Sequence, residues 1–212
     1  WLSLLLAVLS SGALADAAPA MVFQHLTSED GLSQDTVMAT VQDEQGFIWL
    51  ATEDGLDRYD GYNIRRFGRE RGSSTGLVGN FIWSITPGRN GLLWLAVKDG
   101  GIASFDPRSE QFTSYRHKPN DANSLASDVT RQVLVDRRGA VWIATTGGGL
   151  NVLDVAANRV TRFRHDASRA DSLASDNVTA LAEDERGRIW VGTDAGLDLW
   201  QPQGGGFRHF RH

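Results

Sequence analysis

A short phrase that occurs four times constrains the fold of this chain more than any other feature. Each copy has a tryptophan in an apolar run, with a glycine three positions before it and another six positions after it. The tryptophans follow one another at intervals of 45, 48 and 48 residues: Trp49, Trp94, Trp142 and Trp190. A repeat of roughly 40 to 50 residues indicates supersecondary units that stack on their neighbours.

Within one unit, the pattern is that of β-strands. "VTALAED" from Val178 alternates between apolar and polar residues, "RIWVGT" is an apolar run, and "LDLW" and "FRHF" follow after turn residues. Helical periodicity does not occur after residue 20. Four short strands in a repeat of this length predict a β-propeller blade. We therefore expect an all-β chain of four four-stranded blades at about residues 32–71, 77–118, 125–166 and 173–212.

The repeated residues have structural roles in this interpretation. A buried tryptophan removes roughly 150 to 250 Å² from water, so we expect the four tryptophans to fill the space between blades. Stacking platforms for sugars or bases are the alternative. An Asp or Asn stands fourteen positions before each tryptophan, where a linker enters the first strand: Asp35, Asn80, Asp128 and Asp176. We expect these side chains to accept hydrogen bonds from turn backbone groups, with ligand contact as the alternative.

The beginning of the chain has the composition of an export signal. Residues 1–20 are apolar and then rich in small residues, and Ala13-Leu14-Ala15 has a small-x-small pattern. We expect a signal peptide without its n-region, cleaved after Ala15, Ala17 or Ala20; a buried core helix is the alternative. Residues 21–25 contain "FQH", which matches the ends of later units. This segment predicts an outer closing strand, and the chain then forms the front piece of a larger propeller.

The repeats resemble a known family. "DERGRIWVGTDAGLDLW" and its sister copies, with the intervening "NSLASDVT" and "DSLASDNVT", are similar to the two-component regulator propeller repeat over about residues 21–212. Unit two differs, since Gly88 replaces the aspartate found in the other three units. The resemblance implies a periplasmic sensor region anchored in the inner membrane through other parts of the protein. The implied output is a histidine kinase, often hybrid, acting by phosphorelay, or in some relatives a diguanylate cyclase.

The composition and the histidines exclude several function classes. A net charge of −5 offers no basic face for nucleic acid. The histidines recur at the ends of units instead of converging on one point, so we expect no metal site. No unit breaks the repeat to supply catalytic residues, so we expect no cofactor and no catalysis in this segment. A protein-binding scaffold remains an alternative, and a propeller enzyme of the quinoprotein or lyase type is a weaker one.

The turns after the tryptophan strands differ most among the four copies. Their residues vary in charge and size while the scaffold positions stay alike, and such variable loops are where function is usually found. We predict a ligand-binding surface at Glu53, Asp54, Lys98, Asp99 and Asp194. Solvated turns are the alternative. The family resemblance suggests an oligosaccharide or another nutrient fragment as ligand; other expected partners are the rest of the propeller, the signalling chain and, in the full-length protein, a second copy in a homodimer.

Overall fold

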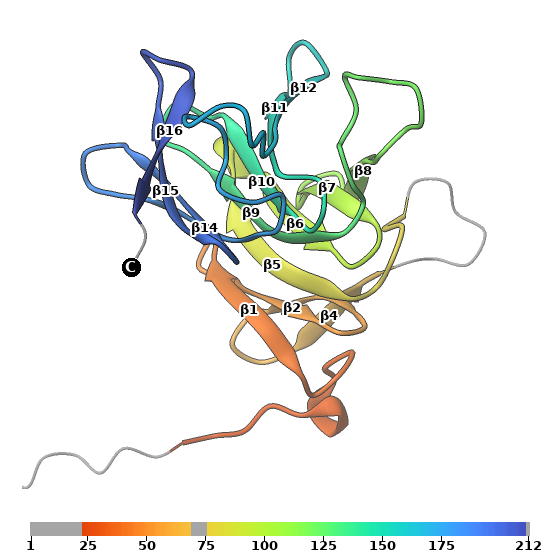
Figure 1. Cartoon of the computed structure of the whole chain (residues 1–212). Helices are drawn as coiled ribbons and strands as arrows, with labels where there is room; N and C mark the ends of the chain where they lie inside the picture. Colours follow the sequence, from red (N-terminus) through yellow and green to blue (C-terminus); the bar gives the residue numbers. More distant parts are fainter. Residues whose placement is uncertain (1–22, 69–75, 211–212) are drawn as a thin grey trace, which may run out of the picture.

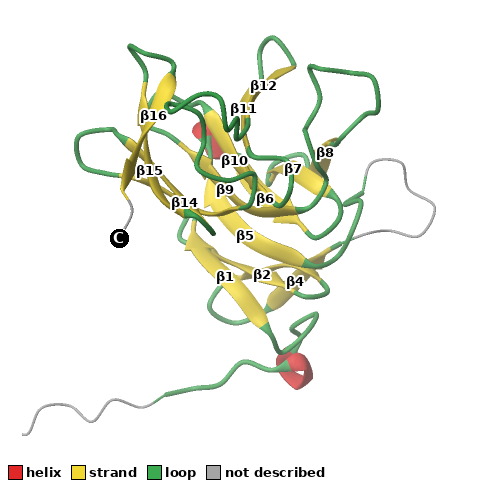
Figure 2. Ribbon diagram, in the orientation of Figure 1, coloured by secondary structure: helices red, strands yellow, loops and turns green. Residues whose placement is uncertain are grey.

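The described residues form four antiparallel sheets, as predicted. The computed structural model describes residues 23–68 and 76–210, so the predicted signal peptide lies outside the described residues. Figure 2 shows strands as the main regular structure, with two short 3₁₀ turns, η1 (Ser28–Asp30) and η2 (Arg89–Gly91). The prediction of an all-β chain with propeller blades is therefore confirmed.

Each sheet contains four strands that pair in chain order. Blade 1 contains β1 (Val37–Gln42), β2 (Ile48–Thr52), β3 (Gly55–Tyr59) and β4 (Ile64–Phe67). Blade 2 contains β5 (Ile82–Pro87), β6 (Leu93–Val97), β7 (Gly101–Asp106) and β8 (Gln111–Tyr115). Blade 3 contains β9 (Thr130–Val135), β10 (Val141–Thr145), β11 (Leu150–Asp154) and β12 (Arg159–Phe163). Blade 4 contains β13 (Val178–Glu183), β14 (Ile189–Thr193), β15 (Gly196–Gln201) and β16 (Gly206–Phe210). The blade boundaries expected from the sequence stay predictions.

The blades contact one another through their first strands. β1 contacts β5, β5 contacts β9, and β9 contacts β13, and the colours of Figure 1 run from orange in blade 1 to blue in blade 4. The side chain of Gln132 donates a hydrogen bond to the carbonyl of Leu181 at 3.1 Å and accepts one from its N–H at 2.7 Å. Because this amide satisfies both backbone groups as a strand partner would, it aligns β9 with β13.

Three apolar clusters fill the junctions between successive blades. Trp49 packs with Ile82 and Phe105 of blade 2, Trp94 with Val133 of blade 3, and Trp142 with residues of blade 4. These three tryptophans are 0%, 3% and 6% exposed. Trp190 is only half-buried. Each buried tryptophan is thus covered by the blade that follows its own.

An aspartate at the turn after the first strand orients three of the tryptophans. The indole N–H of Trp49 donates a hydrogen bond to Asp43 at 2.7 Å, that of Trp142 to Asp136 at 2.9 Å, and that of Trp190 to Asp184 at 3.0 Å. In blade 2 this position is Gly88, and an added Cβ would lie 2.6 Å from the indole of Trp94. The indole therefore occupies the space that the aspartate fills elsewhere, which explains the divergence of unit two.

The closing strand expected at residues 21–25 stays a prediction. Phe23–His25 belong to no strand, and Phe23 is 77% exposed; residues 21 and 22 are not described. A strand needs backbone partners along a sheet edge, and none of the four described sheets pairs with this segment.

Candidate functional site

The strands of each blade end on two opposite sides, and the connections on these two sides differ. We call the two sides the linker edge and the hairpin edge. At the linker edge, a linker enters the first strand and the second strand turns into the third; at the hairpin edge, the first strand turns into the second and the third into the fourth. The structure places all five predicted ligand-binding residues in exposed turns at the linker edge: Glu53, Asp54, Lys98, Asp99 and Asp194. The linker edge is therefore the candidate functional site.

The predicted residues contact their linkers rather than one another. Asp54 accepts a hydrogen bond from the amide of Asn80 at 2.8 Å, and Asp194 accepts one from the amide of Asn177 at 2.8 Å. Within residues 23–68 and 76–210, no hydrogen bond or ion pair joins two of the five. The site is thus a row of separate turns, in two of which a linker residue holds the acidic side chain.

The surroundings of Asp194 favour the ionised form of its carboxyl group. A hydrogen bond from the hydroxyl of Ser175, followed by that from the amide of Asn177, holds the pKa of Asp194 below its ordinary value. The carboxylate keeps a fixed orientation on an exposed turn. It can therefore act as a negatively charged acceptor for hydroxyl or amine groups of a ligand.

A β-bulge near the linker edge re-aims one side chain in every first strand. The pairing of the first strand with the second shifts by one residue at the same place in all four blades. Bulges turn a side chain away from the regular alternation of the strand. The bulged residues are Met38, Trp83, Arg131 and Thr179.

The bulges of blades 2 and 3 build a cluster of aromatic and cationic side chains. The rings of Phe81 and Trp83 lie 4.5 Å apart. The ammonium of Lys98 lies 5.1 Å from the ring of Phe81, and the guanidinium of Arg131 lies 5.0 Å from that of Trp83. Of these four residues, sequence analysis identified only Lys98. The available signal was the position eleven residues before each tryptophan, where the four bulged residues all differ.

The four Asp/Asn residues before the first strands lie in the linkers. Asp128 accepts a hydrogen bond from the backbone N–H of His117 at 2.6 Å, and Asp176 accepts one from His165 at 2.8 Å. Asp35 accepts one from the backbone N–H of Ser28 at 2.6 Å, whereas Asn80 donates to Asp54. Two of the four therefore tie a linker to the end of the preceding blade. The structural role expected for them stays a prediction.

A buried polar residue in the third strand holds the linker that leads into the same blade. Asp57, Asn151 and Asp198 accept hydrogen bonds from backbone N–H groups of linker residues at 2.8, 2.9 and 2.7 Å. Directly opposite, in the fourth strand, stand Arg66, Arg162 and His209. We call each such pair a clasp. Blade 2 has Ala103 and Ser114 in these places.

The fourth-strand member of each clasp contacts linker carbonyl oxygens. Arg66 donates to the carbonyls of Gly31 and Leu32, at 2.6 Å in both cases. Arg162 donates to four oxygen atoms of the linker before blade 3, from 2.7 to 3.1 Å. The clasps position the backbone from which the linker edge is built. Sequence analysis did not identify them.

The structure carries two further findings about the part of the chain it describes. No group of three or more His, Asp or Glu side chains is arranged to hold a metal ion among these residues. No helix in the described ranges has the length and apolar character needed to cross a membrane.

The repeats match a known family model. The model of the two component regulator propeller matches residues 31–54 and 172–195, which cover the first tryptophan repeat and the last. Among curated proteins, histidine kinase P4 of Formosa agariphila is 38% identical over 56 residues, which are 26% of this chain and 4% of that protein.

Solved structures show the same architecture. The extracellular domain of the hybrid two component system BT3049 from B. thetaiotaomicron superimposes with a TM-score of 0.78 at 27% identity, covering 89% of this chain and 26% of that one. The corresponding domain of BT4673 from the same organism gives 0.66 at 22% identity, covering 82% and 25%. This chain thus spans about a quarter of each of these two structures.

Proposed function

We propose, from the premise that this chain belongs to the two-component regulator propeller family, that it is the ligand-sensing propeller of a transmembrane signal-transduction protein. The described part of the chain has the fold of the extracellular domains of two hybrid two component systems. That similarity supports an exported location, on the periplasmic face, for this segment. It also supports a larger propeller, because each of those domains is more than three times as long as this chain.

The proposed output is a histidine kinase acting by phosphorelay. The support is the similarity to histidine kinase P4 and to the two hybrid systems. A diguanylate cyclase is the alternative output, and a protein-binding scaffold is the alternative role of the propeller. We propose no enzymatic activity for the propeller segment itself, and a membrane anchor and signal peptide belong to the proposal.

The linker edge is the proposed sensing surface. The observation that carries this is that linker residues hold variable, exposed turns at this edge: Asn80 holds Asp54, and Asn177 holds Asp194. The linker that contains Asn177 is itself fixed to blade 4 by a clasp. The cluster of Phe81, Trp83, Lys98 and Arg131 combines half-buried aromatic rings with cations, and nearby charged groups offer hydrogen bonds to the hydroxyls of a sugar. An oligosaccharide is therefore the proposed ligand class.

The test is a double variant in the full-length protein. Lys98→Ala with Asp99→Asn should reduce ligand-induced expression of a reporter gene at least tenfold, while the melting temperature of the propeller stays within 2 °C. Exposed side chains contribute about ±0.5 kcal/mol, and asparagine tolerates the left-handed backbone of Asp99 (φ 55°). The inducers are a set of purified oligosaccharides. Phosphate transfer and cyclic di-GMP should be measured in parallel, because they distinguish a kinase from a cyclase.

The matched control changes one cation and one acid at the opposite edge. Arg138→Ala with Glu185→Ala alters two exposed residues in hairpin-edge turns and should leave induction unchanged. Normal induction in the Lys98/Asp99 variant would remove this turn from the sensing surface. Equal losses in both double variants would indicate a general effect on the propeller.

A further inference from the structure

A pocket lies at the hairpin edge between blades 1 and 2. Its cavity volume is about 700 Å³, within the range of roughly 300–1,000 Å³ found for small-molecule sites. Blade 1 contributes Phe47 and Arg58, and blade 2 contributes Asn90, Pro107 and Arg108. The pocket is at the opposite edge from the proposed sensing surface.

Arg58 breaks the repeat at a position that faces the next blade. It stands opposite Trp49 in the pairing of β2 with β3. The residues opposite the tryptophan in the other three blades are uncharged: Ser104, Val152 and Leu199. A cation at this place is therefore not needed to build a blade.

The guanidinium of Arg58 has no hydrogen-bonding partner among the described residues. Its Nε is buried without an acceptor. The guanidinium carbon lies 4.4 Å from the ring centre of Phe47 and 5.8 Å from that of Trp49. Aromatic faces attract the flat side of a guanidinium, but its N–H groups still require acceptors. Leaving a buried donor of a charged group unpaired destabilises the folded state more than leaving a neutral donor unpaired.

Two acidic residues line the pocket, and neither forms an ion pair with Arg58: Glu44 is exposed, and Asp43 has other hydrogen-bonding partners. Asp43 accepts hydrogen bonds from the indole of Trp49 at 2.7 Å and from the backbone N–H groups of Gln45 and Phe47 at 3.0 and 2.9 Å. Arg108, on the other wall, donates to the carbonyl of Asn90 at 2.7 Å and lies 3.9 Å from Asp106. Among the charged groups that line this pocket, the Nε of Arg58 is the buried atom without a hydrogen-bonding partner.

A corresponding pocket between blades 3 and 4 shows what is specific here. Its volume is about 520 Å³, and Trp142 and Arg188 are among its lining residues. Arg188 is paired with Asp184 at 2.6 Å, and the position of Arg58 is taken by Val152. The space between blades recurs, whereas the unpaired cation next to an aromatic ring does not.

We propose that the pocket between blades 1 and 2 binds an organic carboxylate. The guanidinium of Arg58 anchors the carboxylate by charge-assisted hydrogen bonds, which are stronger than neutral ones. The ring of Phe47 and the side chain of Pro107 contact the carbon skeleton of the ligand. The inference does not depend on sensing at the linker edge. An acidic sugar and an aromatic acid both present this chemistry.

The test measures binding to the whole chain with both kinds of carboxylate. The probes are trigalacturonate and benzoate, and their neutral counterparts are galactotriose and benzamide. Calorimetry should give a Kd of about 1 mM or tighter (−4.1 kcal/mol) for at least one carboxylate. The NMR signal of the Trp49 indole N–H should shift during the same titration. The carboxylate that binds more tightly shows whether the pocket takes an acidic sugar or an aromatic acid.

Two arginine variants provide the comparison. Arg58→Leu introduces the residue type found at Leu199 and should weaken carboxylate binding at least tenfold. Arg65→Leu is the matched control, because Arg65 also lies over an aromatic ring, 5.1 Å from that of Phe67, but pairs with Glu110 at 2.6 Å outside the pocket. This control should change Kd less than twofold.

Several outcomes would overturn the proposal. These are no binding of either carboxylate up to 10 mM, equal binding of the neutral probes, or unchanged binding in Arg58→Leu. If Arg58→Leu does not fold, Arg58→Lys decides, since a lysine keeps the charge but loses the planar fork and should weaken binding severalfold. The Lys98/Asp99 double variant should bind the carboxylate normally, which separates failure of this proposal from failure of the sensing surface.

Discussion

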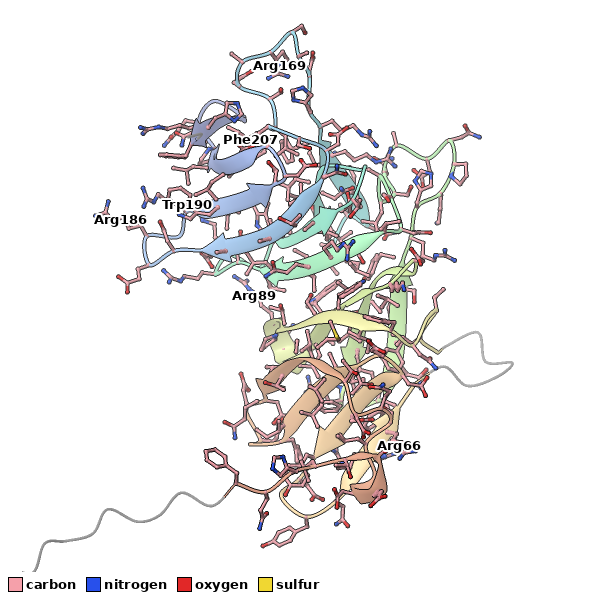
Figure 3. All side chains as sticks on the ribbon, turned by 60° about the horizontal axis from the view of Figure 1, so that its bottom comes forward. Arg66, Arg89, Arg169, Arg186, Trp190 and Phe207 are labelled. Carbon is pink, nitrogen blue, oxygen red and sulfur yellow. The ribbon has the colours of Figure 1, made fainter. Side chains whose placement is uncertain are left out.

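Trp49 and Trp190 occupy the same position in nearly identical stretches of sequence, yet their surroundings differ. Trp49 is fully buried against Ile82 and Phe105 of blade 2. Trp190 is half-buried, and its ring contacts Phe210 at 5.3 Å and Arg188 at 5.3 Å, both in its own blade. Figure 3 shows Trp190 in the blue fourth sheet, with Arg186 on the neighbouring turn.

The two tryptophans share their main hydrogen bond and their place in the blade. Both indoles donate to the aspartate of the preceding turn, at 2.7 and 3.0 Å, and both lie in the second strand of an antiparallel sheet. What differs is the presence of a following blade among the described residues. Each repeat therefore supplies an apolar tryptophan side chain, which becomes part of a buried core where a neighbouring blade covers it.

Truncation of the tryptophans should give the largest effect and is the direct way to break this comparison. Trp49→Ala should lower the free energy of unfolding by about 3–5 kcal/mol, the range for a large buried aromatic. Trp190→Ala in the same chain should cost about 1 kcal/mol, because part of its surface is already in water. Chemical denaturation measures both, and equal losses would show that the following blade does not provide the burial of Trp49.

The stability lost when a clasp is broken should not depend on a following blade, unlike the stability lost when a tryptophan is truncated. Each clasp joins a blade to its own linker, so it needs no following blade. Asn151→Ala in blade 3 and Asp198→Ala in blade 4 should therefore each cost about 2 kcal/mol, since both leave buried linker N–H groups unpaired. Ser114→Ala in blade 2, which has no clasp, is the control and should change stability by less than about 0.5 kcal/mol. A much smaller loss for Asp198→Ala than for Asn151→Ala would mean that blade 4 depends on a neighbour throughout.

The smallest expected effect concerns the charge of the clasp in blade 1. Burial raises the pKa of Asp57 above 3.8, against the opposing hydrogen bonds from Ser33, and one of its carboxylate oxygens has no partner. The folded state thus keeps this proton to a higher pH than the unfolded state, so the contribution of Asp57 to stability falls as pH rises above 3.8.

Asp57→Asn should therefore stabilise the chain at pH 7 by about 1 kcal/mol. Blade 3 already has Asn151 at this position. The gain should disappear as the pH is lowered towards 3.8, where Asp57 becomes protonated in both states. Melting temperatures of the variant and the wild type between pH 3.5 and 7.5 check this, and a gain that is constant with pH would exclude an electrostatic cause.

The placement of the candidate residues was predictable where it follows from strand order. Glu53, Lys98 and Asp194 lie at one edge because each follows a second strand, and strand order was readable from the repeat. The partners of these residues were not predictable. Trp83 and Arg131 come together because bulges in two different blades turn their side chains towards one linker edge. The sequence of a single strand does not show which side chain of another blade lies beside it.

The sequence by itself determined the blade: four short strands, the turns between them, the tryptophan wedge and the aspartate that holds its indole. These depend on contacts within about 25 residues along the chain, as in the bond from Trp142 to Asp136 or from Ala126 to Asn151. Only the tertiary structure decided which wedges are buried, which turns are braced and which cation is left without a partner. Trp49 and Trp190 differ, and Arg58 stands in a pocket, because burial and charge pairing depend on the neighbouring blade, which lies roughly one repeat of 40 to 50 residues away in the chain.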